Sequence, residues 1–526
     1  MFASGALTVA DLIERVPGVT GFRSGWLASP KYGAVNGDLT RIKVFYDGIE
    51  MDNLDPRSPV LDLTLVELWT LESVQIERFA NEVRVHVRSW RATSTDPYTR
   101  TDVFTGDENS NLYRGFYGKR WGSGFGLQLG GQQFSTRSPR LGGGGDALSF
   151  MARVGIAKRV WSIDAYGVRR SGSRSLQPTF STADGLSIPA YDGTSDLFYV
   201  RGAVGNQNGG PWAQVTASRM LFADRSPFVT PAQAVESRLV ADTTDTTVTR
   251  FQYVGAAGFS RGALRASVTD RVRAFNDDVF HTPSARVEVA NQFGHVGLYA
   301  EHNQYSRSRR ADLIGRLTPL SFLAVAGAVS TSEPFDSVAA TAPPSWKAAR
   351  VEAGVRLVNP WLFGGFITRD TAILVGPTMF DTAYKSVRIG KRQGLYAGLR
   401  GKLFKDLNVD VVGTRWDSAG FYQPRYQARS EINIDTRWRS RFPSGNFGLK
   451  AAVIYDYRSE VRFPTETGFR ETPWSGITSA LLEIRILRGV ASYQVRNISN
   501  MNYQYIPDFF MPRTINIYGI RWEFWN

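Results

Sequence analysis

The sequence predicts an all-β transmembrane barrel of about 22 antiparallel strands, with a small N-terminal α+β domain ahead of it. Three observations lead to this fold class. From about residue 99 onward, apolar and polar residues alternate in one segment after another. The connections between these segments alternate between short and long, and the chain ends on a strand with two unlike faces.

The final strand shows the two faces most clearly. Its apolar face carries Tyr518, Ile520, Trp522 and Phe524. Glycine and charged residues occupy the positions between them, so one face is large and apolar and the other is small or charged. Such a strand resembles the closing strand of bacterial outer-membrane barrels, where the aromatic pattern serves as the assembly signal. Here Trp525 and Asn526 follow Phe524, so the predicted signal is displaced from the end.

Earlier segments repeat this pattern. In residues 148–156, Phe150 and Val154 alternate with Ser149 and Arg153. Marking every such segment predicts strands near residues 99, 111, 122, 147, 160, 195, 211, 247, 262, 284, 295, 308, 320, 346, 360, 388, 405, 425, 446, 476, 489 and 513. An even strand number of this size predicts a wide lumen, which barrels of this kind usually plug.

The connections support a membrane barrel over a soluble sandwich. The long stretch 172–194 is followed by the brief 206–210, and 458–474 is followed by a tight turn at 488–489. Short turns on one rim and long loops on the other are typical of outer-membrane barrels. A few early and middle connections are short on both sides.

Composition excludes several classes. The chain has no cysteine, which excludes disulfides and thiolate metal sites, and its four histidines are too dispersed for a zinc site. No apolar run approaches the roughly 18 residues of a spanning helix. The formal charge is +14, but the arginines are spread at strand spacing, so we expect no nucleic-acid partner.

The residue patterns predict no enzyme, no metal site and no cofactor. The acidic pairs Asp277 with Asp278 and Glu50 with Asp52 are interpreted as solvated turn residues, because nothing in the sequence places them in a cleft. Residues 107–111 (DENSN) lack the ligand alternation of a calcium loop.

Residues 1–97 lack the long series of alternating segments. We therefore predict a separate plug domain there, followed by the barrel in residues 98–526. Residues 8–16 have apolar positions at helical spacing, with Thr8 as the N-cap and Pro17 and Gly18 as the stop. Short strands are predicted at 41–46 and 74–79, and Asp47 with Gly48 forms a turn after the first of them.

Three segments of this domain, residues 11–19, 41–48 and 71–78, resemble in order and spacing the plug of TonB-dependent outer-membrane receptors. The matching positions are Pro17, Gly18, Asp47, Gly48 and Glu77. Residues 495–500 with Tyr503 resemble the segment that precedes the closing strand in that family. After Glu77 and Arg78 the chain continues directly as FANEVRVHVRSW, so the predicted plug is shortened.

The resemblance implies an outer-membrane receptor and transporter that takes up a scarce substrate, small or oligomeric. It implies as partners the lipid and lipopolysaccharide of the bacterial outer membrane, the barrel assembly machinery and a TonB-type energy-coupling protein, with the chain as a monomer. No coupling box precedes Leu7 and the N-terminus lacks the features of a signal peptide, so outer-membrane delivery requires residues upstream of Met1. A passive, porin-like channel and a structural or adhesive surface barrel stay open as alternatives.

Aromatic residues near both ends are candidates for ligand capture, with one cation among them. They are Phe22, Arg23, Trp26 and Tyr32 in the plug, and Tyr503, Tyr505, Phe509 and Phe510 in the last loop. We favour another interpretation of the same residues, namely ordinary packing between plug and wall or an interfacial aromatic belt. Arginines on the lumen edges, such as Arg153 and Arg350, fit either an anionic ligand or wall-to-plug ion pairs, and we favour the ion pairs.

Overall fold

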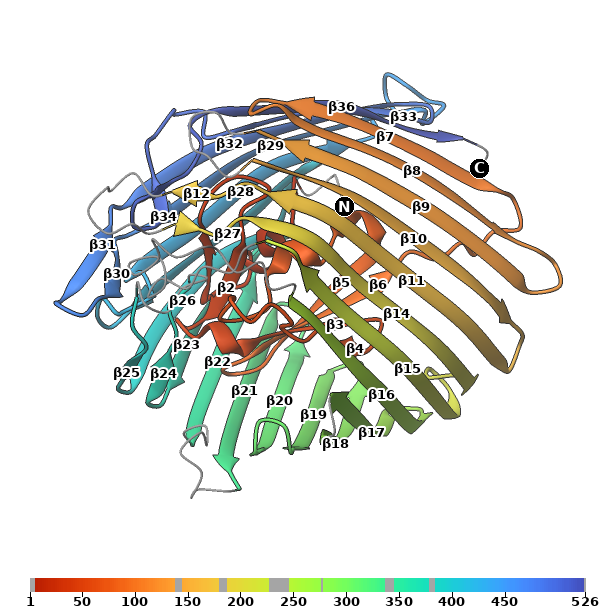
Figure 1. Ribbon diagram of the computed structural model, residues 1–526, viewed down its shortest axis with the longest axis horizontal. Helices are drawn as coiled ribbons and strands as arrows, with labels where there is room; N and C mark the ends of the chain where they lie inside the picture. Colours follow the sequence, from red (N-terminus) through yellow and green to blue (C-terminus); the bar gives the residue numbers. More distant parts are fainter. Residues whose placement is uncertain are drawn as a thin grey trace.

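The computed structural model describes residues 5–137, 144–178, 187–226, 246–275, 278–335, 345–377 and 384–524. It is a closed antiparallel barrel of 22 strands with the N-terminal residues folded inside it (Figure 1). In the part of the chain that is described, no helix has the length and apolar character needed to cross a membrane.

The barrel strands follow one another around the wall in chain order, and β36 closes the barrel against β7. They are β7 (Tyr98–Gly106), β8 (Ser110–Arg120), β9 (Phe125–Thr136), β10 (Gly145–Ala157), β11 (Trp161–Arg174), β14 (Tyr191–Gly205), β15 (Gly210–Asp224), β16 (Thr246–Arg261), β17 (Leu264–Phe275), β18 (Asp278–Asn291), β19 (Gly294–Asn303), β20 (Ser308–Leu320), β21 (Leu323–Pro334), β22 (Trp346–Arg356), β23 (Trp361–Arg369), β26 (Arg392–Phe404), β27 (Leu407–Trp416), β28 (Tyr426–Thr436), β29 (Phe447–Arg458), β32 (Ser475–Ile486), β33 (Gly489–Arg496) and β36 (Ile515–Phe524). Each predicted strand coincides with one of these, and the largest displacement is at β18, expected near residue 284.

Apolar side chains point outward and polar or small side chains point into the barrel, as predicted. On β10, Phe150 is 58% exposed on the outside, while its neighbours Ser149 and Met151 are buried. On β36, the outward positions are Tyr518, Ile520, Trp522 and Phe524, all of them exposed. An apolar outward face is what contact with lipid requires. The role of this strand as an assembly signal stays a prediction, and Trp525 and Asn526 lie outside the described residues.

The two rims differ in their connections, as the sequence predicts. The short-turn rim has connections such as 158–160, 262–263 and 487–488, whereas the long-loop rim has 459–474 and 497–514. Short hairpins fold within these loops: β12 (Gln177–Pro178) with β13 (Ser187–Ile188), β24 (Ala372–Leu374) with β25 (Val387–Ile389), β30 (Val461–Pro464) with β31 (Phe469–Thr472), and β34 (Gln504–Ile506) with β35 (Phe509–Phe510). Several connections break the rule: 107–109 and 304–307 are short on the long-loop rim, and 437–446 is long on the short-turn rim.

The plug contains one short helix and two small sheets. Its elements are α1 (Val9–Ile13), β1 (Val19–Arg23), β2 (Lys31–Val35), η2 (Leu39–Arg41), β3 (Ile42–Tyr46), β4 (Ile49–Glu50), η3 (Leu63–Leu65), η4 (Leu68–Thr70), β5 (Leu71–Arg78) and β6 (Val83–Ser89). The sheets are the pair β1 with β2 and the four strands in the order β4-β3-β6-β5. The first barrel strand begins at Tyr98, next to the predicted domain boundary.

Local chemistry sets the ends of α1. The Asp11 carboxylate accepts hydrogen bonds from the backbone N–H groups of Leu7 and Thr8, at 2.7 and 3.1 Å, which satisfies donors at the helix start. The helix ends at Ile13, three residues earlier than predicted, and the chain leaves it through turns that reach Gly18, whose φ is +82°. That left-handed conformation favours glycine.

The sequence did not predict β6. It pairs parallel with β3 and antiparallel with β5, so it lies in the middle of the four-stranded sheet. The predicted turn after β3 is present, with Asp47 and Gly48 both at positive φ, and it leads into β4. The link from β5 to β6 is only residues 79–82, closed by a hydrogen bond from Phe79 N to Glu82 O of 2.9 Å.

Candidate functional site

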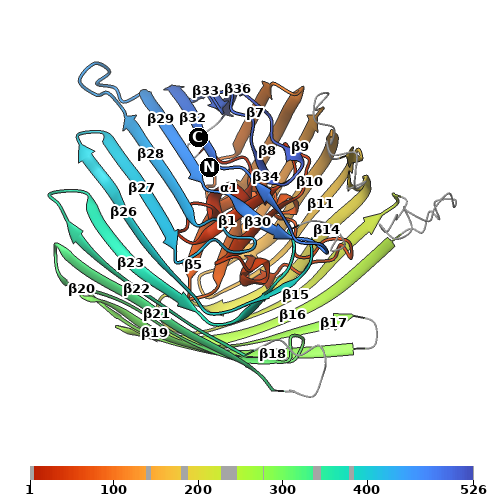
Figure 2. The ribbon, with the colours of Figure 1, turned by 90° about the vertical axis from the view of Figure 1, so that its left-hand side faces the viewer.

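The long loops cover the plug with aromatic side chains. Figure 2 looks into the barrel and shows β30 and β34 across the plug, and β34 contacts β1. The residues Phe22, Tyr32, Leu374, Tyr384, Tyr422, Phe463 and Phe509 are all buried there, and we call them the outer cluster. The ring of Phe463 is at its centre, with centroids 5.1 Å from Tyr384, 5.4 Å from Tyr422 and 6.0 Å from Phe22.

The predicted ligand-capture residues lie where the plug meets the loops and the wall, but they belong to separate clusters. Phe22, Tyr32 and Phe509 belong to the outer cluster, and Phe510 is the neighbour of Phe509 in β35. The Trp26 indole N–H donates to Ser110 Oγ at 2.8 Å, which ties the plug to β8. Packing between plug and loops therefore describes their place, and a ligand role for them stays a prediction.

Arg23 is held by two plug carboxylates. Its guanidinium lies 2.9 Å from Asp11 Oδ1 and 2.5 Å from Glu14 Oε2, and 5.5 Å from the Tyr505 ring, which in turn contacts Tyr503. Burial opposes charge on Arg23, but Glu14 and Asp11 raise its pKa well above the usual value. The predicted ligand cation is thus already paired inside the plug.

The barrel wall holds the plug through buried ion pairs. Glu50 lies 2.9 Å from Arg271 and 2.6 Å from Arg273, Asp52 lies 3.2 Å from Arg273, and Glu82 pairs with Arg310. We call these six residues the ion-pair belt. The interpretation of Glu50 and Asp52 as solvated turn residues is wrong, because wall arginines that are distant in sequence surround them. Asp277 lies outside the described residues.

Two belt carboxylates, Glu50 and Glu82, are charged despite their burial. Burial alone would raise the pKa of Glu50, but Arg273 and Arg271 outweigh it and hold that pKa well below its usual range. Glu82 behaves in the same way against Arg310 and Arg84. The plug therefore presents stable negative charge to an arginine-rich wall.

Asp47, in the predicted turn, is a second anchor. The Tyr199 hydroxyl donates to Asp47 Oδ2 at 2.7 Å, and the Arg153 guanidinium lies 3.3 Å from the same oxygen. This confirms the predicted wall-to-plug role of Arg153. Glu77, another motif position, pairs with Arg286 at 2.6 Å. Burial would raise the pKa of Glu77, but its hydrogen bonds and charge interactions with His86 and Arg286 lower that pKa to about 2.

The short-turn side of the plug has open space instead of aromatic packing. A cavity of about 750 Å³ lies between the plug and β20 to β27, with Arg15, Arg78 and Arg350 in its lining. A second cavity of about 830 Å³ is lined by Glu72 and Gln75 and reaches a short turn at residue 207. The edge strand β5 separates the two, because alternate residues line one or the other.

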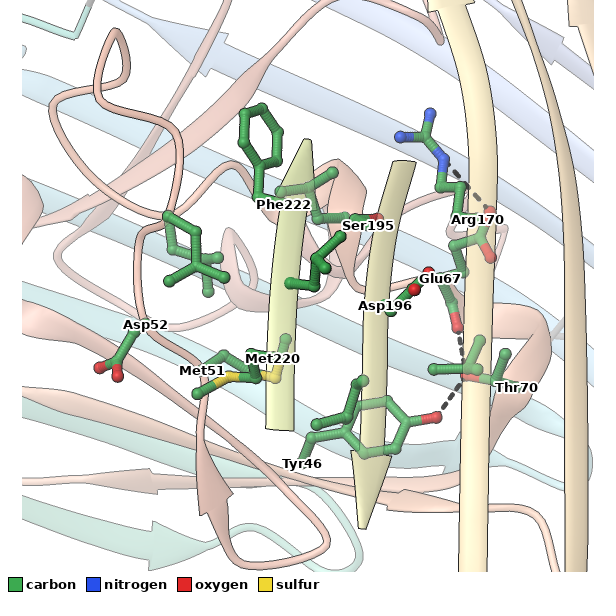
Figure 3. A pocket seen from close by; sticks show the side chains of 16 residues that line it. Tyr46, Met51, Asp52, Glu67, Thr70, Arg170, Ser195, Asp196, Met220 and Phe222 are labelled. Atoms are coloured by element: carbon green, nitrogen blue, oxygen red, sulfur yellow. Dashed lines mark hydrogen bonds and ion pairs between the residues drawn. The ribbon is translucent and has the colours of Figure 1, made fainter. Parts of the chain in front are cut away.

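A small apolar pocket of about 50 Å³ lies where the plug meets β11, β14 and β15 (Figure 3). Met51 of the plug and Met220 of the wall meet at its floor, and the Tyr46 hydroxyl bonds Thr70 Oγ1 at 2.8 Å. On the far side, Arg170 lies 3.6 Å from Glu67. With room for little more than water, the pocket is a packing gap and not a substrate chamber.

Two polar side chains on the long-loop side stand out because they are buried without hydrogen-bond partners among the described residues. The Arg369 side chain, on a residue only 1% exposed, has three nitrogens and none makes a hydrogen bond with the described residues. The amide of Gln423 is in the same position. Sequence reasoning missed both, since β23 alternation shows only that Arg369 points inward.

In the described residues, no group of three or more histidines and carboxylates is placed to hold a metal ion.

Comparison with known proteins identifies the fold. The siderophore receptor PirA from Acinetobacter baumannii superposes with a TM-score of 0.72 at 10% identity, over 98% of this chain and 96% of that one. The FrpB iron transporter from Neisseria meningitidis gives 0.73 at 8% identity, over 99% and 97%. The copper transporter OprC gives 0.72 at 11% identity, over 99% and 96%. No protein-family model matches the sequence, and no curated protein does. The chain therefore has the fold of these solved structures.

Proposed function

We propose that the protein is an outer-membrane receptor that takes up a scarce substrate, with plug movement driven by a TonB-type energy-coupling protein. One observation carries the proposal: the plug is closed by the outer cluster on the long-loop side and faces open cavities on the short-turn side. Its fold is that of solved structures described as a siderophore receptor, an iron transporter and a copper transporter. Those proteins are not enzymes, and we assign no catalysis to this one.

The closed side argues against a passive channel. A permanent pore needs a continuous aqueous path, whereas the rings around Phe463 are fully buried and loop residues bond the plug directly. For example, the Gln177 amide donates to Ser24 O at 2.6 Å. Substrate can pass only after the loops part and the plug moves, so transport requires a gating step.

Unpaired buried cations favour an anionic group on the substrate. A guanidinium buried without partners is costly, and a carboxylate or phosphate can satisfy it with two parallel hydrogen bonds. Arg369 meets this description, and Arg458, beside the Phe22 ring at 5.0 Å, has two unpartnered nitrogens. Both lie near the outer cluster, where a ligand entering between loops and plug would arrive.

The remaining partners follow from this placement. We propose that the outward apolar strand faces contact outer-membrane lipid and lipopolysaccharide, that the β36 aromatics engage the barrel assembly machinery, and that the chain works as a monomer.

Conductance of the purified full chain in planar bilayers tests the gating. We expect no steady conductance from the wild type, because the plug and the outer cluster block the lumen. A large, constant conductance without any coupling protein would overturn the proposal in favour of a passive channel.

A cysteine pair tests plug movement in cells. The chain has no cysteine, and Ala80 N lies 3.3 Å from Ser330 Oγ, so A80C/S330C can lock plug to wall. We expect a disulfide in this pair to abolish growth supported by the receptor under iron or copper limitation, and reduction to restore it. Equal growth with and without the disulfide would indicate a surface barrel without a transport role.

A further inference from the structure

The connection between β28 and β29 is the exception on the short-turn rim. It spans residues 437–446, and it projects beyond the neighbouring turns in Figure 2. Backbone hydrogen bonds order it: Arg441 N and Phe442 N both donate to Trp438 O, at 3.0 and 2.9 Å. Leu487 N donates to Asn446 O at 2.7 Å, which ties the loop to the β32–β33 turn. The loop is therefore a defined surface of the rim.

Aromatic side chains of this loop continue the outward face of β29. Phe442 stacks on Phe447 with centroids 4.4 Å apart, and Trp438 lies 6.2 Å from Phe447. Phe447 begins the outward apolar stripe that includes the exposed Val453 and Tyr455. Trp438 is itself 49% exposed. The rings thus extend the lipid-facing surface past the end of the strand, to the depth where tryptophan prefers the membrane interface.

Positive charge surrounds these rings. Arg437, Arg439 and Arg441 are exposed, and none of them forms an ion pair with the residues that the structure describes. The flanking turns add the exposed cations Lys405 and Arg488, against the exposed acid Asp406. This segment of the rim is therefore strongly basic, next to an apolar surface that faces lipid.

We propose that residues 437–446 form a binding site for the head group of an anionic phospholipid in the leaflet on the short-turn side. Arginine binds phosphate with paired hydrogen bonds, and a basic segment at the membrane surface is attracted to anionic lipid. An acidic soluble protein is the poorer fit, because the rings at the base of the loop continue a surface that lipid already covers. The inference rests on the proposed membrane location and not on the identity of the substrate.

Lipid binding to the purified full chain in detergent tests the site, with phosphatidylglycerol and phosphatidylethanolamine as probes in native mass spectrometry. We expect the wild type to retain phosphatidylglycerol in preference. The variant R437S/R439S/R441S should lose about tenfold in that preference, as the removal of three partly screened surface cations predicts. W438A should weaken the binding of both lipids.

The matched control is K158S/R159S in the three-residue β10–β11 turn of the same rim, which removes two cations without touching residues 437–446. It should leave the preference unchanged. An equal loss in this control would reduce the effect to general charge and overturn a defined site, as would an unchanged preference in the triple variant. Circular dichroism checks that each variant keeps its strands. Failure of the wild type to insert into vesicles would count against the membrane location instead.

Discussion

The plug is held in two chemically different ways. On the long-loop side, the outer cluster joins plug and loops through aromatic rings and contains no carboxylate or cation. On the wall side, the ion-pair belt joins plug and barrel through buried carboxylates and arginines, such as Glu50 with Arg273. The first contact is between the plug and the long loops, and the second is between the plug and strands fixed in a closed sheet.

This difference assigns separate tasks to the two contacts. Aromatic packing is largely non-directional, so loop rings can exchange plug rings for the apolar part of a ligand. A buried ion pair is specific, because removing one partner leaves an uncompensated charge. We infer that the outer cluster is the part that responds to ligand, and that the belt sets the resting position of the plug until energy is supplied.

The largest effect should come from breaking the belt. Glu50→Gln keeps the size of the side chain but leaves Arg271 and Arg273 with one buried charge partner fewer, which costs about 3–5 kcal/mol. We expect the plug to open more often by that amount, measured as the opening free energy in amide hydrogen exchange of residues 5–97.

The control for this variant is Glu72→Gln on the exposed face of β5, where a surface change is worth about 0.5 kcal/mol or less. Equal exchange in both variants would show that the belt does not hold the plug.

A smaller and more local effect should come from the outer cluster. Phe463→Ala removes a fully buried ring that contacts three others, at a cost of about 3 kcal/mol, the low end for such a truncation since the loops can collapse. We expect faster proteolysis of the loop 459–474 with unchanged exchange in the plug. Phe469→Ala, in the same hairpin but 52% exposed, is the matched control.

Acid should separate the two contacts without a mutation. Burial opposes charge on Glu50, but the wall residues Arg273 and Arg271 hold its pKa well below the ordinary 4.5. The pKa of Glu77 is lowered to about 2 by His86, which stays with the plug, and by Arg286 of the wall, against the effect of burial. The released plug therefore binds more protons than the docked plug in this interval, so the stability of docking falls as the pH drops from 4.5 to about 2.

Pepsin cleavage of the plug, normalised to cleavage of the denatured chain, measures this fall. The outer cluster has no carboxylate, so the loops should keep their protection until the plug leaves. Loss of loop protection ahead of the plug would contradict the division of tasks.

The smallest effect concerns two glycines with positive φ. Both Gly18 and Gly48 adopt left-handed backbone, so alanine costs about 1 kcal/mol at either. A Cβ on Gly18 would also meet Asn36 Oδ1 at 3.0 Å, whereas one on Gly48 would meet nothing within 4 Å. We expect Gly18→Ala to lower the free energy of plug unfolding more than Gly48→Ala, and equal losses would show that backbone strain alone matters.

The wall was predictable because its rule is local. A strand in lipid must alternate between apolar and polar residues, and the outward Phe150 beside the buried Ser149 follows that rule wherever the strand pairs. The same holds for the turn at Asp47 and Gly48, whose two positive φ angles are readable from a dipeptide. The ligand role of the aromatic candidates near both ends stays a prediction.

The plug interior was not predictable because its partners are distant in the chain. β6 is parallel to β3 and central in its sheet, yet nothing local distinguishes it from a strand of the wall. Glu50 was misread because Arg271 and Arg273 lie more than two hundred residues away, and the charge of a turn does not reveal what faces it.

By itself, the sequence determined that this protein is a barrel of 22 alternating strands with a small capped domain in front, since periodicity, caps and turns act over a few residues. Only the tertiary structure decided which side of the plug is sealed by rings and which is held by charge, and it alone left Arg369 buried without a hydrogen bond to the described residues. The physical reason is that burial and electrostatic pairing depend on groups that the closure of the barrel brings together.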